Sequence, residues 1–318
     1  MYPASAKGSP ALRNPFVSML ITIGLILGKW FETRAHQRAL LPSDSIAFGP
    51  DLAQSIEFWP AHHTLEETRR AAPLIVFIHG GGWSMGTTEN ATGHAKIAHF
   101  TARGLAFATV GYRLVPDVRV EDQAADLAQA LGALFAEADR LGVDRTRVLL
   151  MGHSAGAHLA ALVGTDPRWL QSAGLSFDAI AGIIAIDGAA YAVGQQIREA
   201  PLLLRSLYRQ AFGNEPDRQH ILSPTSQATA PNVANWMLLY VNRRDGIRQT
   251  ETLTAALRRA GSTVDLVALP GRGLLGHIAS NRRLGDPAWP GTTAVDQWID
   301  RILASRISVP RLAATAKI

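Results

Sequence analysis

The sequence has 318 residues, enough for one large domain or two small ones with a substantial buried core. Apolar residues make up 47% and charged residues 18%, the balance of a folded globule and not of a disordered chain. The net charge of +5 comes from scattered arginines, so nothing favours nucleic-acid binding. The sequence contains no cysteine, which excludes disulfides, thiolate metal sites and thiol nucleophiles.

The first 45 residues are predicted to form a leader. A polar start is followed by an apolar run over residues 16–28 and then by Lys29, the layout of an export signal. The run is shorter than the roughly 20 residues that cross a bilayer, although Trp30 and Phe31 extend it. We therefore expect an exported protein, periplasmic or secreted, or one anchored to a membrane through residues 16–31. A soluble apolar helix on a cytoplasmic protein is the alternative.

From residue 46 to 306, short apolar runs alternate with stretches of helical spacing. Strands are predicted between 45 and 60 and over 73–79, 105–110, 144–153, 179–186, 236–241 and 263–269. Helices are predicted over 92–103, 120–141, 249–260 and 293–306. This alternation is typical of an α/β domain with a mostly parallel sheet covered on both faces. Residues 191–231 break the rhythm and are predicted to be a small cap-like insertion beside the substrate, and 307–318 to be a tail.

The sequence Gly152-His-Ser-Ala-Gly156 stands between an apolar strand and an alanine-rich helical pattern. In this context a G-x-S-x-G turn presents a serine hydroxyl above the edge of the sheet. Glycines flank the serine because a Cβ atom would collide with the neighbouring backbone. Ser154 is therefore the candidate nucleophile.

A second glycine-rich segment, His79-Gly-Gly-Gly-Trp83, directly follows a predicted buried strand. Ordering three consecutive glycines costs considerable chain entropy, which argues against a merely connecting role. We expect an oxyanion hole made by the backbone N–H groups of Gly81, Gly82 and Ala155. His79 is expected to brace the loop and not to catalyse.

A serine nucleophile needs a base, and the base needs an acid that holds its tautomer. His277 follows the last predicted strand in a glycine-rich loop and is the candidate base. Asp245 and Asp187 follow two earlier strands, so both have the required place between serine and histidine. We predict Asp245, which follows the strand before the last, as in the usual hydrolase order, and keep Asp187 as the alternative.

These motifs, together with Gly111-Tyr-Arg-Leu114 and Ala157-His-Leu-Ala160, resemble the α/β-hydrolase superfamily. The resemblance is to hormone-sensitive-lipase-like esterases and to the carboxylesterase and kynurenine formamidase-like group, and it covers residues 46–306. It implies the α/β-hydrolase fold and a serine carboxylesterase with the triad Ser154, Asp245 and His277. Such an enzyme cleaves small to medium acyl esters through an acyl-enzyme, without a metal or organic cofactor.

Other functions stay open at this point. An arylformamidase would use the same triad on an N-formyl group, and a binding protein could have kept the fold without turnover. The expected partner is thus a small-molecule ester or formamide. Trp83 and Tyr191 are candidate substrate-binding residues, and the oligomeric state is not indicated by the sequence.

Overall fold

The computed structural model describes residues 41–62, 71–89 and 93–307. The leader up to residue 40 and the tail from residue 308 lie outside the described residues, so those two predictions are not addressed. Within the described ranges, no helix is both long and apolar enough to span a membrane.

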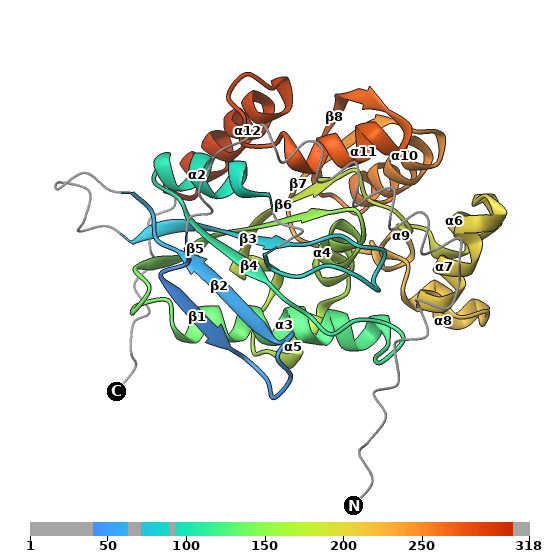
Figure 1. The fold of residues 1–318 in the computed structure, drawn as a ribbon, viewed down its shortest axis with the longest axis horizontal. Helices are drawn as coiled ribbons and strands as arrows, with labels where there is room; N and C mark the ends of the chain where they lie inside the picture. The colour runs from blue at the N-terminus through green and yellow to red at the C-terminus, as the bar shows by residue number, and fades with distance from the viewer. Residues whose placement is uncertain (1–40, 63–70, 90–92, 308–318) are drawn as a thin grey trace, which may run out of the picture. The chain divides into compact units, whose positions relative to one another are not determined.

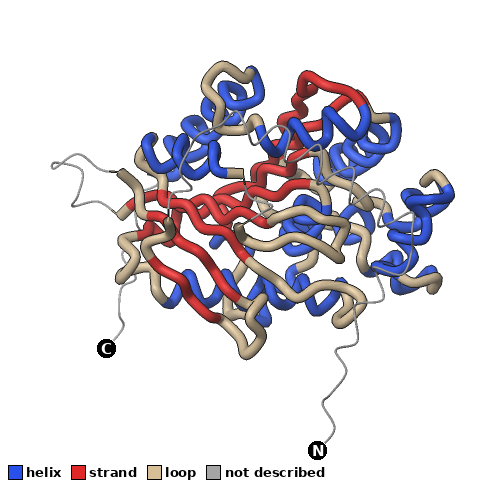
Figure 2. The backbone as a smooth tube through the Cα atoms, in the orientation of Figure 1, coloured by secondary structure: helices blue, strands red, loops and turns tan. Residues whose placement is uncertain are grey.

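One sheet of eight strands organises the described chain (Figures 1 and 2). The strands lie in the order β1 (Asp44–Ala47), β2 (Ser55–Trp59), β4 (Ala106–Val110), β3 (Ala72–Ile78), β5 (Val143–His153), β6 (Ile180–Ile186), β7 (Asn235–Asn242) and β8 (Thr263–Arg272). The β1–β2 and β2–β4 pairs are antiparallel and the remaining pairs are parallel. The predicted α/β class with a mostly parallel sheet is confirmed.

Helices cover both faces of this sheet, as Figure 1 shows. One face packs against α3 (Val120–Ala136), α4 (Ala155–Thr165) and α5 (Pro167–Ser172), and the other against α2 (His94–Ala102) and α12 (Pro290–Ile307). Helix α10 (Arg244–Arg259) connects β7 to β8, and α11 (Gly273–Arg282) follows β8. Successive residues of the central strands alternate between two buried clusters, which is why their sequences are apolar throughout.

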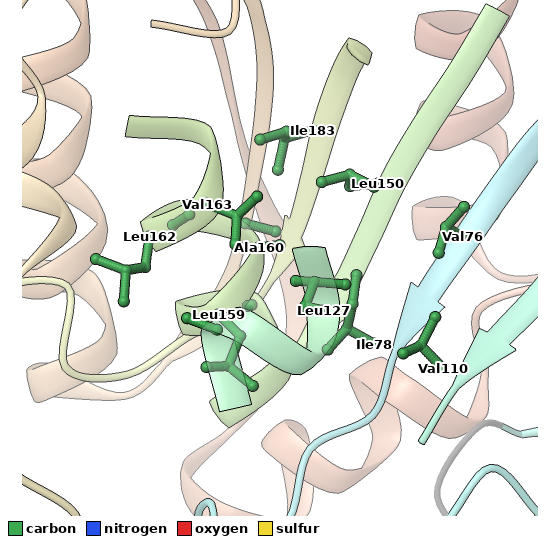
Figure 3. Close-up of a cluster of buried hydrophobic side chains, with 14 of the residues drawn as sticks. Val76, Ile78, Val110, Leu127, Leu150, Leu159, Ala160, Leu162, Val163 and Ile183 are labelled. Carbon is green, nitrogen blue, oxygen red and sulfur yellow. The ribbon is translucent and has the colours of Figure 1, made fainter. Parts of the chain in front are cut away.

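The helix that follows the nucleophile candidate is the most deeply buried one. Every residue of α4 is buried, and its alanines allow the helix to lie close to the sheet. Figure 3 shows Ala160 and Val163 of α4 beside Leu150 and Ile183 of the sheet. This packing fixes the start of α4, and with it the turn that carries Ser154.

The segment predicted as an insertion forms four short helices, α6 (Val193–Glu199), α7 (Leu202–Phe212), α8 (Pro216–Ile221) and α9 (Pro224–Gln227). These helices connect β6 to β7 and contribute no strand over residues 191–231, all of which the structure describes. The β6–β7 pair keeps a regular register from Ile183 opposite Trp236 to Ile186 opposite Leu239. The insertion therefore leaves the sheet undisturbed.

Candidate active site

Ser154 occupies a strained turn between β5 and α4. Its backbone is left-handed, with φ 55° and ψ −117°, a conformation that non-glycine residues rarely adopt. A Cβ atom on Gly152 would lie 2.3 Å from the oxygen of Gly156, and one on Gly156 would lie 2.1 Å from the oxygen of Ile78. Both glycines of the motif are thus required by close backbone contacts, as the sequence predicts.

His277 and Asp187 form the acid–base pair of the site. His277 Nδ1 lies 2.5 Å from Asp187 Oδ2. A carboxylate accepts hydrogen bonds, so Nδ1 carries the proton and Nε2 is left to accept one. The Asp187 side chain is fully buried, and its other oxygen accepts a hydrogen bond from Val241 N at 3.2 Å.

Asp187 is held in its charged form. Burial alone would raise its pKa, but the hydrogen bond from His277 and the positive charge of Arg243 lower the pKa below its ordinary value. An ionised carboxylate is what keeps the His277 ring in the tautomer with its proton on Nδ1.

The prediction of Asp245 as the acid is wrong in this geometry. Helix α10 begins at Arg244, which puts Asp245 in its first turn and not in the loop after β7. The Asp245 carboxylate accepts from Arg243 Nη1 at 2.5 Å and from Gln196 Nε2 at 3.3 Å. The alternative, Asp187, is the carboxylate that contacts His277.

Strand register explains why Asp187 has this role. His153 of β5 pairs with Ile186 of β6, so the next residues, Ser154 and Asp187, leave neighbouring strands at the same level. The backbone N–H of Ser154 donates to the oxygen of Ile186 at 3.0 Å, and that of Asp187 donates to Leu239 at 2.7 Å. Nucleophile and acid are therefore placed by the sheet itself.

His277 lies on helix α11 and not in the glycine-rich loop that the sequence predicts. His153, next to the nucleophile, fixes this helix: its Nε2 donates to the backbone oxygen of His277 at 3.0 Å, and the two rings lie 4.5 Å apart. Burial, and secondarily the positive charge of a protonated His277, keep the pKa of His153 well below its ordinary value. No role was predicted for His153 from the sequence, although its place beside Ser154 in the G-x-S-x-G motif was a signal.

The glycine loop after β3 lies against the nucleophile turn. Gly81 and Gly82 have φ of 125° and 59°, and a Cβ on Gly81 would lie 2.0 Å from the oxygen of Met85. A Cβ on Gly80 would lie 3.1 Å from the Cβ of Ser154. Ala155 is the first residue of α4. The predicted oxyanion donors thus come from two segments that meet at Ser154.

His79 has the bracing position that we expected. Its ring stacks on that of Tyr112 at 4.2 Å, and its backbone oxygen accepts a hydrogen bond from the Tyr112 hydroxyl at 2.7 Å. Burial lowers the pKa of His79 to about 4, so the ring is neutral at physiological pH.

Trp83 and Tyr191, the predicted substrate-binding residues, are both 1% exposed. The Trp83 indole donates to His158 Nδ1 at 3.3 Å and packs against Phe212 at 4.7 Å between ring centroids. The Tyr191 hydroxyl fills the space that a side chain on Gly188 would need. Both side chains are used for internal packing and neither is exposed, so their role in substrate binding stays a prediction.

Arg243 contacts the acid of the site, which its sequence position beside Asp245 did not predict. Its guanidinium lies between Asp187 and Asp245, within the basic stretch after β7 that the sequence shows. Among the described residues, no group of three or more histidine and acidic side chains could hold a metal ion.

Comparisons with known proteins agree with this fold. The family model BD-FAE matches residues 63–182. Esterase LipC of Mycobacterium tuberculosis (strain ATCC 25618 / H37Rv) is 26% identical over 282 residues, which cover 85% of this chain and 66% of LipC. The carboxylic ester hydrolase LipN of the same strain is 28% identical, with 74% of this chain and 66% of LipN covered. The chain thus spans just under two thirds of the length of these two relatives.

Among solved structures, esterase B from Lactobacillus rhamnosis with a tributyrin phosphonate superposes with a TM-score of 0.69. The superposition covers 92% of this chain and 96% of esterase B at 19% sequence identity. An identity this low supports the fold and no finer statement. With its eight-stranded, mostly parallel sheet and its serine turn after β5, and with its similarity to these esterases, the chain has the α/β-hydrolase fold.

Proposed function

We propose that this chain is a serine carboxylic-ester hydrolase in which Ser154 is the nucleophile, His277 the base and Asp187 the acid. The observation that carries the proposal is the 2.5 Å contact between His277 Nδ1 and the buried carboxylate of Asp187, which leaves the strand beside that of Ser154. The relatives and structures reported above are named esterases, which supports an ester as the substrate.

The first half-reaction forms an acyl-enzyme. His277 Nε2 takes the proton of the Ser154 hydroxyl while Oγ attacks the ester carbonyl. The carbonyl oxygen becomes negative and accepts hydrogen bonds from the N–H groups of Gly81, Gly82 and Ala155. His277 then gives its proton to the leaving alcohol, and the C–O bond breaks.

The second half-reaction repeats these roles with water. His277 removes a proton from a water molecule, which attacks the acyl carbon, and then returns a proton to Ser154 Oγ as the acid product leaves. Throughout, the ionised Asp187 stabilises the positively charged His277. We propose small to medium acyl esters as substrates; no feature of the site favours an N-formyl substrate.

The proposal is tested by initial rates on p-nitrophenyl acetate, with N-formylkynurenine in parallel. We expect ester turnover in the intact chain and its loss in Ser154→Ala. Asp187→Asn is expected to lose roughly 10⁴-fold in kcat, the loss that follows when a triad acid no longer fixes the histidine tautomer. Asp245→Asn is expected to keep most of its activity, as is the exposed control Asp139→Asn.

Three outcomes would contradict the proposal. Near-normal turnover in Asp187→Asn with an inactive Asp245→Asn would restore Asp245 as the acid. A strong preference for N-formylkynurenine would make the protein a formamidase. No turnover of either substrate, and no reaction of Ser154 with a fluorophosphonate probe, would favour a binding protein with a hydrolase fold.

We further propose that residues 1–45 direct the protein out of the cytoplasm or anchor it to a membrane. The apolar run over 16–28 and its basic flank support this. Fractionation of cells that produce the full chain is expected to place it in the membrane or outside the cytoplasm. A wholly soluble, unprocessed cytoplasmic product would contradict the proposal.

A further inference from the structure

Arg243 lies between two carboxylates at the acid end of the site. Its Nε is 3.4 Å from Asp187 Oδ2, and its Nη1 is 2.5 Å from Asp245 Oδ2. Its Nη2 also donates to the backbone oxygen of Gly188 at 3.3 Å. The guanidinium is thus held on three sides by the chain segment after β6 and by the first turn of α10.

The backbone is shaped to admit this contact. A Cβ atom on Gly246 would lie 3.0 Å from Arg243 Nη2 and 3.2 Å from Asp187 Oδ1. The glycine therefore lets the start of α10 approach both charged groups. The Arg243 side chain is 18% exposed, so water screens its charge only in part.

The charges around Arg243 have opposing effects on His277. A cation beside Asp187 reduces the negative potential that the His277 ring experiences, which favours the neutral ring, the form that acts as a base. The negative charge of Asp245 offsets part of that cation. The titratable groups around Arg243, Asp187 and Asp245 are Tyr191, Tyr208, His153 and His277, and Lys96 of α2 adds a further positive charge beside His153.

We propose that Arg243 is a positioning residue: it holds Asp187 against His277 and, balanced by Asp245, sets the pH at which His277 becomes a base. This inference deepens the esterase proposal and rests on its triad. It assigns to the Arg243–Asp245 pair a role in the working pH range of the enzyme. It also explains why Asp245, which does not contact His277, is bound so closely by Arg243.

The test is a titration of the His277 ring by ¹⁵N NMR in the full chain, in parallel with pH profiles of kcat/KM. Arg243→Gln removes the cation, and we expect the His277 midpoint and the acidic limb of kcat/KM to move to higher pH by about half a unit or more. Asp245→Asn removes the balancing anion, and both are expected to move to lower pH. Arg243→Lys keeps the charge and is expected to stay closer to the wild type than Arg243→Gln.

The matched control is Arg145→Gln, which removes an arginine from an exposed pair with Asp139 and is expected to leave the midpoint unchanged. Shifts of opposite sign in Arg243→Gln and Asp245→Asn would support the inference, since merely loosened packing would not produce them. If Arg243→Gln does not fold, the His277 midpoints of Asp245→Asn and Arg243→Lys are compared with that of the wild type instead. Midpoints that coincide with the wild type in the folded variants would overturn it.

Because the NMR readout does not require turnover, the two proposals fail separately. Midpoints that move as expected in a protein without esterase activity would refute the proposed function and leave the charge coupling standing. An active esterase whose His277 midpoint is the same with and without Arg243 would support the proposed function and refute the charge coupling.

Discussion

Gly81 combines a conformational requirement with a proposed catalytic one. Its φ of 125° is unfavourable for any residue with a side chain, and its carbonyl closes a tight turn by accepting from Met85 N at 3.0 Å. An alanine here would collide with the oxygen of Met85. The loop would have to move, and the N–H groups that it presents near Ser154 would move with it.

We therefore expect Gly81→Ala to lower kcat on p-nitrophenyl acetate by roughly 10²–10³-fold, the effect of losing one oxyanion donor. Gly104→Ala is the matched control, because Gly104 also has positive φ, 79°, but a Cβ there meets nothing within 4 Å. The control is expected to melt lower and to keep its kcat. A Gly81→Ala variant with normal kcat would exclude this loop from the oxyanion hole.

The acid shows what a sequence can reveal about a single residue. Asp187 and Asp245 both follow strands in the right chain order, so order alone leaves both possible. The two aspartates differ in the position of their strands within the sheet. Strand β6, which precedes Asp187, lies next to β5, and its Ile186 pairs with His153. The pairing register between strands cannot be predicted from the local sequence, which is why the prediction of Asp245 as the acid was wrong.

At the scale of elements, the strands were predictable and the helix starts near the site were not. The strands are continuous apolar runs because both faces of the sheet are covered, and this pattern is visible in β3, β5 and β6. Helix α10 instead begins with Arg244-Asp-Gly, and α11 begins with Gly-Leu-Leu-Gly. Polar residues and glycines favour loops, so Asp245 and His277 were predicted to lie in loops.

The burial of Trp83 and Tyr191 could not be predicted for a related reason. Trp83 follows the glycines of the proposed oxyanion hole, and Tyr191 opens the insertion, so both have the chain position of pocket residues. Their large side chains instead anchor segments of the domain: Trp83 packs against Tyr208 and Phe212 of α7. Sequence position could not reveal these Trp83 contacts, since they join residues more than 100 positions apart.

At the scale of the whole molecule, the buried neutral histidines predict that the folded protein loses stability in acid. His79 and His158 both have pKa values that burial lowers to about 4. In the unfolded chain these rings take up protons near pH 6.5, whereas in the folded protein they resist until about pH 4. Their contribution to stability is thus complete above the unfolded value and is lost as the pH falls from 6.5 towards 4.

We expect the free energy of unfolding, measured with urea, to fall between pH 7 and pH 4.5 by up to about 1.4 kcal/mol per pH unit for each such histidine below pH 6.5. His158→Gln keeps an acceptor near Trp83 Nε1 but cannot take up a proton. Its free energy of unfolding is therefore expected to fall less steeply with pH, by the contribution of about one proton. A wild-type profile that is flat over this range would contradict the burial of neutral rings.

The insertion between β6 and β7 also has an evolutionary consequence. Helices α6 to α9 join two strands whose pairing continues as if the insertion were absent, while Leu207 of α7 approaches Gly82 of the proposed oxyanion loop. The proposed nucleophile and acid are positioned by the sheet, whereas the helices of the insertion can lengthen, shorten or exchange side chains without a change in strand register. Under the proposed mechanism, descendants of such a protein can therefore change the substrate that they accept while they keep the same reacting groups.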